Sequence, residues 1–262
     1  MSKPIYPSGH DCVDILQGGD LLTSSSAKII KSNEFDNVHY NVVMYLAPSD
    51  LSGHNLCAHA SGICILLCLN TAGRASFDVK IPKARLRRAT LFNTCKICFL
   101  IRLDYELARE ARKAARLERK LCVRLNGTSD VCWEFIAQRL MAKYSNAIWY
   151  DYTKYPYHTR PSDKLPANYS LTYSFSENTT AKQLAENLDN GRNVAVVFSR
   201  SKRTEHNLPS VWNGTPVING DLHDMRFLDA PSHIVGLLAK GQALGKVNGF
   251  VIDATAPVAL AA

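Results

Sequence analysis

Three cysteines lie within twelve residues of this chain, in the pattern Cys57-x6-Cys64-x3-Cys68. Thiolates are the ligands that iron–sulfur clusters and other soft metal centres prefer. Three thiolates on one loop can hold three irons of a [4Fe–4S] cluster and leave the fourth iron open to a substrate or cofactor. The spacing therefore makes Cys57, Cys64 and Cys68 candidate cluster ligands.

Two other interpretations of these cysteines stay open. A structural zinc site usually has four ligands, so His59 or the pair Cys95 and Cys98 would have to complete it. Alternatively, the three side chains are buried as small hydrophobic groups. This second interpretation is supported by their apolar neighbours, which are Ile63, Ile65, Leu66 and Leu67.

The other five of the eight cysteines carry weaker signals. Cys95-Lys-Ile-Cys98 has the spacing of a zinc or redox motif, but it lies among apolar residues where we expect a helix, so we interpret it as an incidental pair. Cys12, Cys122 and Cys132 have no partner at metal-ligand spacing and are predicted to be structural. The N-terminal residues lack the apolar core of a signal peptide, which predicts a cytoplasmic protein with reduced thiols.

Short apolar strands separated by helices must position these residues. The sequence predicts strands at 40–46, 122–126, 147–152, 171–175, 194–198, 216–218, 234–238 and 250–253, and helices at 79–93, 97–120, 131–144 and 180–188. This alternation favours an α/β fold, specifically a partial or full (β/α) barrel with mostly parallel strands. We expect an irregular N-terminal segment at 1–39 and a single barrel-like domain at 40–262. The longest apolar run has seven residues, too few for a membrane span.

The positive charge of the chain is concentrated in one segment. Residues 74–124 contain 15 Lys or Arg and 5 Asp or Glu, a local charge of +10, whereas the whole chain carries +8. A basic segment on a nearly neutral body is typical of a protein that binds nucleic acid. A charged helix face in solvent is the alternative, because leucines and alanines recur at spacings of three and four along 100–121. The candidate nucleic-acid-binding residues are Arg85, Arg87, Arg88, Arg112 and Arg116.

The order of five segments resembles the gene product 88 family of phage and plasmid proteins. After the cysteine loop come the basic helix, a strand that ends in Asn126-Gly-Thr-Ser-Asp130, and the aromatic stretch at 148–154. Further similar stretches lie at 169–177, 193–198 and 217–224, so the resemblance covers about residues 50–252.

The cysteine loop of that family is distantly similar to the loop of the radical S-adenosylmethionine enzymes, which are partial barrels with a cluster loop after the first strand. This resemblance implies that Cys57, Cys64 and Cys68 hold the iron. It also implies that the turn after the next strand lies beside the amino-acid end of S-adenosylmethionine. The cofactor-binding residues it implies are Asn126, Gly127, Ser129 and Asp130. The spacing departs from the usual C-x3-C-x2-C, and Leu67 replaces the usual aromatic residue before the last cysteine.

The resulting expectation is a cytoplasmic iron–sulfur protein of a phage or mobile element that modifies a nucleotide or nucleic acid, with S-adenosylmethionine as cofactor if the protein is catalytic. The alternative is a non-catalytic, basic nucleic-acid-binding phage protein whose cysteines bind zinc or are simply buried. The sequence contains no G-x-G-x-x-G, H-E-x-x-H or G-x-S-x-G motif, so it offers no sign of the chemistries those motifs carry.

Overall fold

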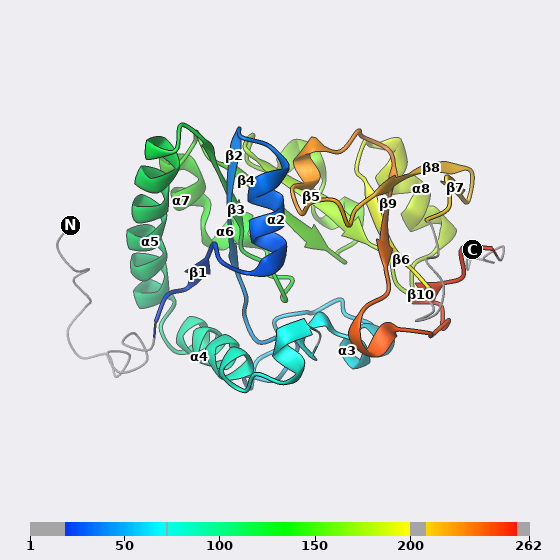
Figure 1. Cartoon of the computed structure of the whole chain (residues 1–262), viewed down its shortest axis with the longest axis horizontal. Coiled ribbons are helices and arrows are strands. Elements are labelled where there is room, and N and C mark those ends of the chain that lie inside the picture. Colours follow the sequence, from blue (N-terminus) through cyan, green and yellow to red (C-terminus); the bar gives the residue numbers. More distant parts are fainter. Residues whose placement is uncertain (1–18, 72, 200–207, 256–262) are drawn as a thin grey trace. The chain divides into compact units, whose positions relative to one another are not determined.

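The structure is a computed structural model that describes residues 19–71, 73–199 and 208–255. Strands and helices alternate along most of this part of the chain (Figure 1). The strands are β1 (Leu22–Thr23), β2 (His39–Met44), β3 (Lys120–Arg124), β4 (Ile148–Thr153), β5 (Tyr169–Ser174), β6 (Val194–Phe198), β7 (Val211–Trp212), β8 (Thr215–Asn219), β9 (Ile234–Leu238) and β10 (Val251–Ile252). The α-helices are α2 (Ala27–Phe35), α3 (Gly62–Leu66), α4 (Lys80–Thr94), α5 (Lys96–Arg116), α6 (Trp133–Ile136), α7 (Gln138–Lys143) and α8 (Ala181–Asp189).

The described strands form a ten-stranded, mostly parallel sheet in the order β1-β2-β3-β4-β5-β6-β9-β8-β7, with β10 beside β6. The pairs β2–β3, β3–β4, β5–β6, β6–β9, β8–β9 and β6–β10 are parallel, whereas β1–β2 and β7–β8 are antiparallel. The predicted mixed α/β fold with mostly parallel strands is therefore confirmed.

The chain divides into two compact units. Unit 1 contains the described residues up to Ala58, together with Asp78–Trp149 and Pro166–Tyr169, and unit 2 contains His59–Phe77, Tyr150–Leu165 and the described residues from Ser170 onward. Cys57 thus belongs to unit 1, whereas Cys64 and Cys68 belong to unit 2.

Regular structure in the described part of the N-terminal segment begins earlier than expected. β1 and α2 precede β2, and Ser26 is the N-cap of α2, where its side chain accepts a hydrogen bond from the Ile29 backbone N–H. The sequence analysis assigned this stretch to loops because it is rich in Ser and Gly. Serine is also a preferred N-cap residue, and that property prevails here.

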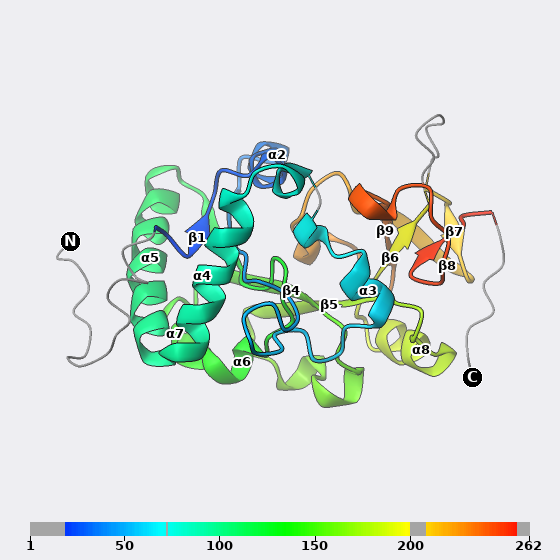
Figure 2. The same cartoon turned by 90° about the horizontal axis from the view of Figure 1, so that it is seen from below.

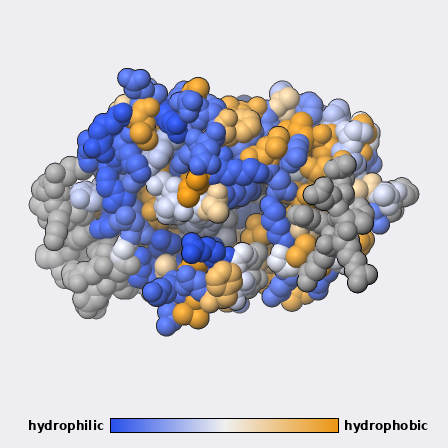
Figure 3. All heavy atoms as spheres, viewed as in Figure 1, coloured by the Kyte–Doolittle hydropathy of each residue, from blue (hydrophilic) through white to orange (hydrophobic). Residues whose placement is uncertain are grey.

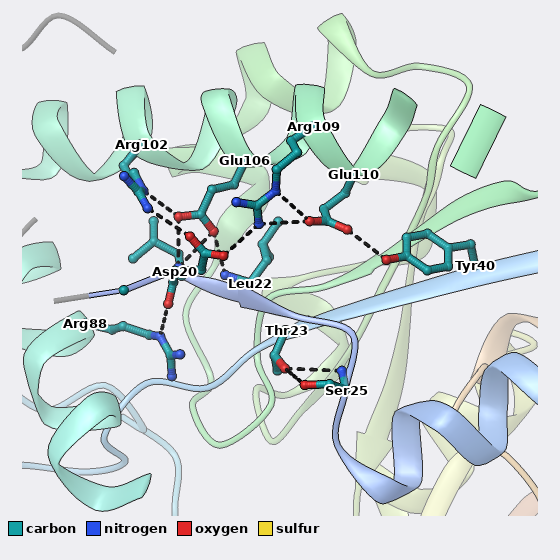
Figure 4. A network of polar contacts seen from close by, with 12 residues as sticks. Asp20, Leu22, Thr23, Ser25, Tyr40, Arg88, Arg102, Glu106, Arg109 and Glu110 are labelled. Atoms are coloured by element: carbon teal, nitrogen blue, oxygen red, sulfur yellow. Dashed lines mark hydrogen bonds and ion pairs between the residues drawn. The ribbon is translucent and has the colours of Figure 1, made fainter. Parts of the chain in front are cut away.

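A buried carboxylate on α5 holds β1 in place (Figure 4). Glu106 is fully buried and accepts hydrogen bonds from the backbone N–H groups of Leu21 and Leu22, at 2.8–3.0 Å. Burial raises the pKa of Glu106, although these two N–H donors and Arg102 oppose the shift. These bonds satisfy backbone groups that a two-residue strand leaves unpaired.

Two arginines of α5 extend this network to Asp20. Arg102 and Arg109 each lie 2.9 Å from one oxygen of the Asp20 carboxylate (Figure 4). Burial alone would raise the pKa of Asp20, but the two arginines outweigh it and hold the pKa below its usual value. On the same helix, Glu110 accepts a hydrogen bond from the Tyr40 hydroxyl of β2 at 2.8 Å. The chain on either side of β1 is thus fixed to α5 by buried or half-buried polar groups.

Aromatic side chains form part of the core of unit 1. Phe92 of α4, Phe99 of α5 and Trp133 of α6 contact one another, with ring centroids 5.2–6.0 Å apart. α4 and α5 meet at a corner at Cys95, whose backbone leaves the helical region (φ −144°, ψ 88°), and Figure 2 shows both helices from below. The two helices predicted at 79–93 and 97–120 are therefore present and joined by one residue, but the second ends at Arg116, because the chain turns there to begin β3 at Lys120.

The core of unit 2 lies around β5, β6 and β9. Its buried cluster is Tyr173, Phe175, Leu184, Val194, Val196, Phe198, Trp212, Ile234 and Ile252. β6 and β9 have the boundaries that the sequence predicted, because a run of β-branched residues bounded by polar ones marks a buried strand. The capping box of Thr180 and Gln183 likewise starts α8 where a helix was expected.

Candidate functional site

Cys57 lies beside the turn that follows β3. Its Sγ is 3.8 Å from the carbonyl oxygen of Thr128, and its backbone N–H donates to the side-chain oxygen of Asn55 at 2.8 Å. The preceding residue, Leu56, accepts a hydrogen bond from the Asp130 backbone N–H at 2.8 Å. Because β2 and β3 are parallel, the loops after both strands leave the same edge of the sheet, and Cys57 lies where they meet.

The two loops are joined by backbone contacts that require a glycine. The Gly127 N–H donates to the Met44 carbonyl at 2.9 Å, and a Cβ at residue 127 would lie only 2.5 Å from that oxygen and 2.5 Å from a ring carbon of Tyr45. Thr128 then donates its hydroxyl hydrogen to the Leu46 carbonyl at 2.6 Å. The close approach of the Met44 carbonyl explains why residue 127 is a glycine. A left-handed backbone is not the reason, because the φ of Gly127 lies outside that region.

The buried side chain of Asn126 stabilises the turn through hydrogen bonds. Its side-chain oxygen accepts hydrogen bonds from Ser129 Oγ, the Val131 backbone N–H and the Trp133 indole N–H at 2.9–3.0 Å, and its Nδ2 donates to the Val131 carbonyl. Asn126 and Ser129 are buried, whereas Gly127 and Asp130 are half-buried. The structure therefore brings the four predicted cofactor-binding residues together beside Cys57, with Asn126 and Ser129 facing the protein.

Cys64 lies on the short helix α3, and Cys68 lies two residues beyond its end. Ser61 is the N-cap of α3, where its Oγ accepts a hydrogen bond from the Cys64 N–H at 3.1 Å. The carboxylate of Glu177 accepts from Ser61 Oγ at 2.7 Å and from the Ile63 N–H at 3.1 Å. Glu177 thus fixes the start of α3 within unit 2.

The other end of α3 is fixed by an apolar contact. Leu67 packs in a buried cluster with Ala239, Ala243 and Val251. Cys68 Sγ accepts a hydrogen bond from the Asn70 backbone N–H at 3.4 Å. Both Cys64 and Cys68 remain half-buried, while Leu66 between them is 64% exposed. The cysteine helix therefore exposes apolar side chains and keeps its sulfurs near the surface.

We asked whether the cysteines fit a metal centre. In residues 19–71, 73–199 and 208–255, no group of three or more His, Cys, Asp or Glu side chains is placed so that it could hold a metal ion. The donor chemistry does fit a cluster, because Cys57, Cys64 and Cys68 are all half-buried and none of them forms a disulfide with another described cysteine.

The remaining described cysteines differ from these three. Cys95 and Cys98 are buried and form a disulfide at the corner between α4 and α5, so the interpretation as an incidental pair within one helix is wrong. Cys122 is buried in β3, and burial raises the pKa of its thiol to about 12. Cys132 precedes α6 and is half-buried, and Cys12 lies outside the described residues.

The five predicted nucleic-acid-binding arginines fall into two groups. Arg85 is buried and lies 5.2 Å from the ring centroid of Tyr45, and Arg87 donates to the Gly19 carbonyl. Arg88 donates to the carbonyls of Asp20 and Tyr45, and burial lowers its pKa to about 10. These three arginines therefore bind residues of unit 1 itself.

Arg112 and Arg116 are exposed on α5. Lys113 between them is also exposed, and its Nζ lies 5.1 Å from the ring centroid of Tyr40. Figure 3 shows that hydrophilic residues predominate on the face of unit 1 that carries α5. The C-terminal half of α5 therefore provides a basic surface.

Two site features escaped the sequence analysis. Ser61 was not identified as a helix N-cap, although a serine directly before an apolar run is a typical signal. Glu106 and Glu110 were counted only as charges in a basic helix. The strand-end residues Lys154 and Asp221 both bind within unit 2: Lys154 donates to the carbonyls of Ser174 and Phe175, and Asp221 pairs with Lys240.

Fold and site together define a mixed α/β protein with a cysteine-rich loop at the carboxyl edge of its first parallel strands. The sequence profile of the family Gene product 88 matches residues 20–254, so the chain belongs to that family. No curated protein and no solved structure matches the chain. The predicted family is therefore confirmed, whereas the likeness to radical S-adenosylmethionine enzymes stays a prediction. None of the described helices combines the length and apolar character that a membrane crossing needs.

Proposed function

We propose that the protein is an iron–sulfur protein of a phage or mobile element, in which Cys57, Cys64 and Cys68 hold a [4Fe–4S] cluster. The observation that carries this proposal is the place of Cys57. It lies at the carboxyl edge of β2 and β3, and its sulfur is 3.8 Å from the turn after β3. Functional groups of parallel α/β folds gather at this edge. The gene-product name of the family agrees with a phage origin.

The strand order supports a barrel-like winding for this fold. β2, β3, β4, β5 and β6 are neighbours in the order in which they occur in the sequence. Right-handed crossovers that always step in one direction place their helices on one face of the sheet, as in a (β/α) barrel. A doubly wound sheet instead reverses its order at a switch point. We therefore propose that the sheet is a partial barrel.

The turn at 126–130 lies beside Cys57 within unit 1. An iron–sulfur cluster with one open iron supplies radical chemistry together with S-adenosylmethionine. The half-buried Asp130 and the backbone at Gly127 are the groups of this chain that would contact the amino-acid end of that cofactor. Asn126 and Ser129 would act by holding the turn, because their side chains bond to one another and to the following residues.

The substrate in this proposal is a nucleotide or nucleic acid. Its support is the basic surface of α5, where Arg112, Lys113 and Arg116 are exposed. Arg85, Arg87 and Arg88 contribute to the fold of unit 1 and are not assigned a substrate contact.

Metal analysis tests the proposal. Protein purified without oxygen is expected to contain about four irons and about four sulfides per chain, and to be brown. The variant Cys57→Ala/Cys64→Ala/Cys68→Ala is expected to contain neither, whereas the matched control Cys132→Ala keeps both. Circular dichroism shows whether the triple variant is folded. Zinc without iron in the wild type, or unchanged iron in a folded triple variant, would contradict the proposal.

The exposed basic surface favours one alternative function, a non-catalytic nucleic-acid-binding protein. That protein would be colourless, and its affinity for DNA or RNA would fall steeply with salt because phosphate contacts release counterions. Replacing Arg112 and Arg116 with alanine is expected to reduce the slope of log affinity against log salt by about 2 for double-stranded DNA. The same change at Arg87 would leave the slope unaltered, which distinguishes the two groups of arginines.

A further inference from the structure

A second cysteine site lies in unit 1, apart from the proposed cluster ligands. Cys95 ends α4 and precedes α5, and Cys98 lies in the first turn of α5. Their Cα atoms are 5.3 Å apart, and the two sulfurs form a disulfide. This separation lies within the range of about 4.4–6.8 Å that disulfides require. The backbone of the corner therefore holds the two sulfurs in position to bond.

The same corner also suits the reduced form. Cys95 is the N-cap of α5, and its Sγ accepts a hydrogen bond from the Cys98 backbone N–H at 3.2 Å. α5 has 21 residues, and the N-terminus of a helix carries partial positive charge. The thiolate is the form of a cysteine that attacks disulfides. One sulfur of the pair is thus prepared to react, and the other lies one turn along the helix to complete the exchange.

We propose that Cys95 and Cys98 form a thiol–disulfide exchange site whose oxidant is a low-molecular-weight disulfide. The Cys95 thiolate attacks one sulfur of the disulfide RSSR, which releases RS⁻ and leaves a mixed disulfide on Cys95. The Cys98 sulfur, after losing its proton, attacks Cys95 Sγ and releases the second RS⁻. Two electrons pass from the protein to RSSR, two thiol protons are released, and RSSR becomes two RSH once the thiolates take up these protons. Two molecules of RSH reverse the reaction.

The burial of the Cys95 and Cys98 side chains determines which reagents can reach their sulfurs. Cys95 is 5% exposed and Cys98 is 0% exposed. Next to Cys98 in the sequence is Phe99, which packs with Phe92 and Trp133 in the aromatic cluster of unit 1. Cys95 is therefore the sulfur that a small reagent meets first, and large protein partners are excluded. The site fits exchange with a small thiol such as glutathione.

Redox titration of the full chain tests this site. The protein is equilibrated without oxygen at a series of ratios of reduced to oxidised glutathione, quenched with acid, alkylated under denaturing conditions and analysed by peptide mass. Cys95 and Cys98 are expected to lose their thiols together, as one two-electron transition. The fraction of protein with a Cys95–Cys98 disulfide is expected to be about one tenth or less in excess reduced glutathione. It is expected to rise to about nine tenths or more in excess oxidised glutathione. Cys122 is expected to stay a thiol throughout.

Two single variants separate the roles of the sulfurs. Cys98→Ser is expected to trap Cys95 as a mixed disulfide with glutathione, because the second sulfur is missing. Cys95→Ser keeps an N-cap acceptor on α5 and leaves a buried Cys98 that forms at least tenfold less mixed disulfide in the same time. If either variant fails to fold, the wild-type titration still decides. Free thiols at every ratio, or a disulfide that no ratio reduces, would overturn the proposal. The readout uses no metal, so it is independent of the iron–sulfur proposal.

Discussion

Two cysteine sites, one in each unit of this protein, are held in different ways. In unit 1, Cys98 is fully buried beside aromatic rings, on a 21-residue helix that the Glu106 network fixes to the chain around β1. In unit 2, Cys64 lies half-buried on a five-residue helix whose start is held by Glu177 and Ser61. The first site is buried on a long helix, whereas the second lies half-buried on a short helix.

This difference teaches how the surroundings of a thiol set its chemistry. A rigid corner that keeps two sulfurs within bonding reach favours a bond between them. A short, half-exposed segment can change its shape at low cost and so can close around a ligand. We therefore propose thiol–disulfide exchange for the Cys95–Cys98 corner and metal binding for the loop 57–68.

Removing the buried carboxylate of unit 1 should have the largest effect. Glu106→Ala removes the acceptor of the Leu21 and Leu22 N–H groups and one of the two carboxylate partners of Arg102, so we expect the free energy of unfolding to fall by about 3–5 kcal/mol. Urea denaturation measures this. The exposed Glu34→Ala should change it by less than about 0.5 kcal/mol. Equal effects of the two variants would show that the network does not anchor β1.

The contact beside Cys57 can be broken by adding one methyl group. Gly127→Ala places a Cβ against the Met44 carbonyl, and we expect a loss of about 2–3 kcal/mol. Gly62→Ala is the matched change at the start of α3, where no atom lies within 4 Å of the added Cβ. It should be neutral or stabilise by up to about 1 kcal/mol. Equal tolerance at both glycines would contradict the close approach of the loops after β2 and β3.

A buried acid gives unit 2 a pH dependence of its own. Burial raises the pKa of Asp229 to about 6, and attraction to Arg226 only partly offsets this. A folded-state pKa above the unfolded value of 3.8 stabilises the fold at low pH, and this contribution is lost as the pH rises through about 6. Because Asp229→Asn cannot titrate, the wild type should lose about 1–2 kcal/mol relative to it between pH 4 and pH 7, allowing for solvent screening. Parallel stability curves would contradict the raised pKa.

The smallest effect is expected at the start of α3. Glu177→Gln keeps the shape of the side chain but weakens the bonds to Ser61 and Ile63, which should cost about 1 kcal/mol. The local loosening should speed alkylation of Cys64 in the native protein several-fold. Cys122, whose thiol pKa is raised to about 12 by burial, serves as the unreactive internal reference. An unchanged rate at Cys64 would show that Glu177 does not hold the helix.

Much of the fold could be predicted because its strands are short, apolar and bounded by polar residues. β6 and β9 were placed to the residue, and α5 was recognised by its apolar stripe. The predicted helix at 131–144 instead divides into α6 and α7 at Ala137, whose φ of −109° leaves the helix. No proline or glycine marks that break, so the sequence carried no local signal for it.

The candidate site was predicted only in part. Spacing identified Cys57, Cys64 and Cys68, and position after a strand identified the turn at 126–130. Neither could reveal that the Asn126 side chain bonds inward, because position after a strand does not show where a side chain points. The contact of Glu177 with the start of α3 was hidden because it joins residues far apart in the sequence. The contacts of Arg85, Arg87 and Arg88 within unit 1 could not be predicted for a related reason: composition counts a charge but does not show whether its side chain bonds inside the fold.

Iron analysis of two reciprocal variants tests the central claim most directly. Cys95→Ser/Cys98→Ser removes the pair in unit 1, and Cys57→Ala/Cys64→Ala/Cys68→Ala removes the three proposed iron ligands. With both proteins purified without oxygen and shown to be folded, we predict about four irons per chain in the first and none in the second. Iron that disappears with Cys95 and Cys98 but survives the loss of the other three would contradict the account.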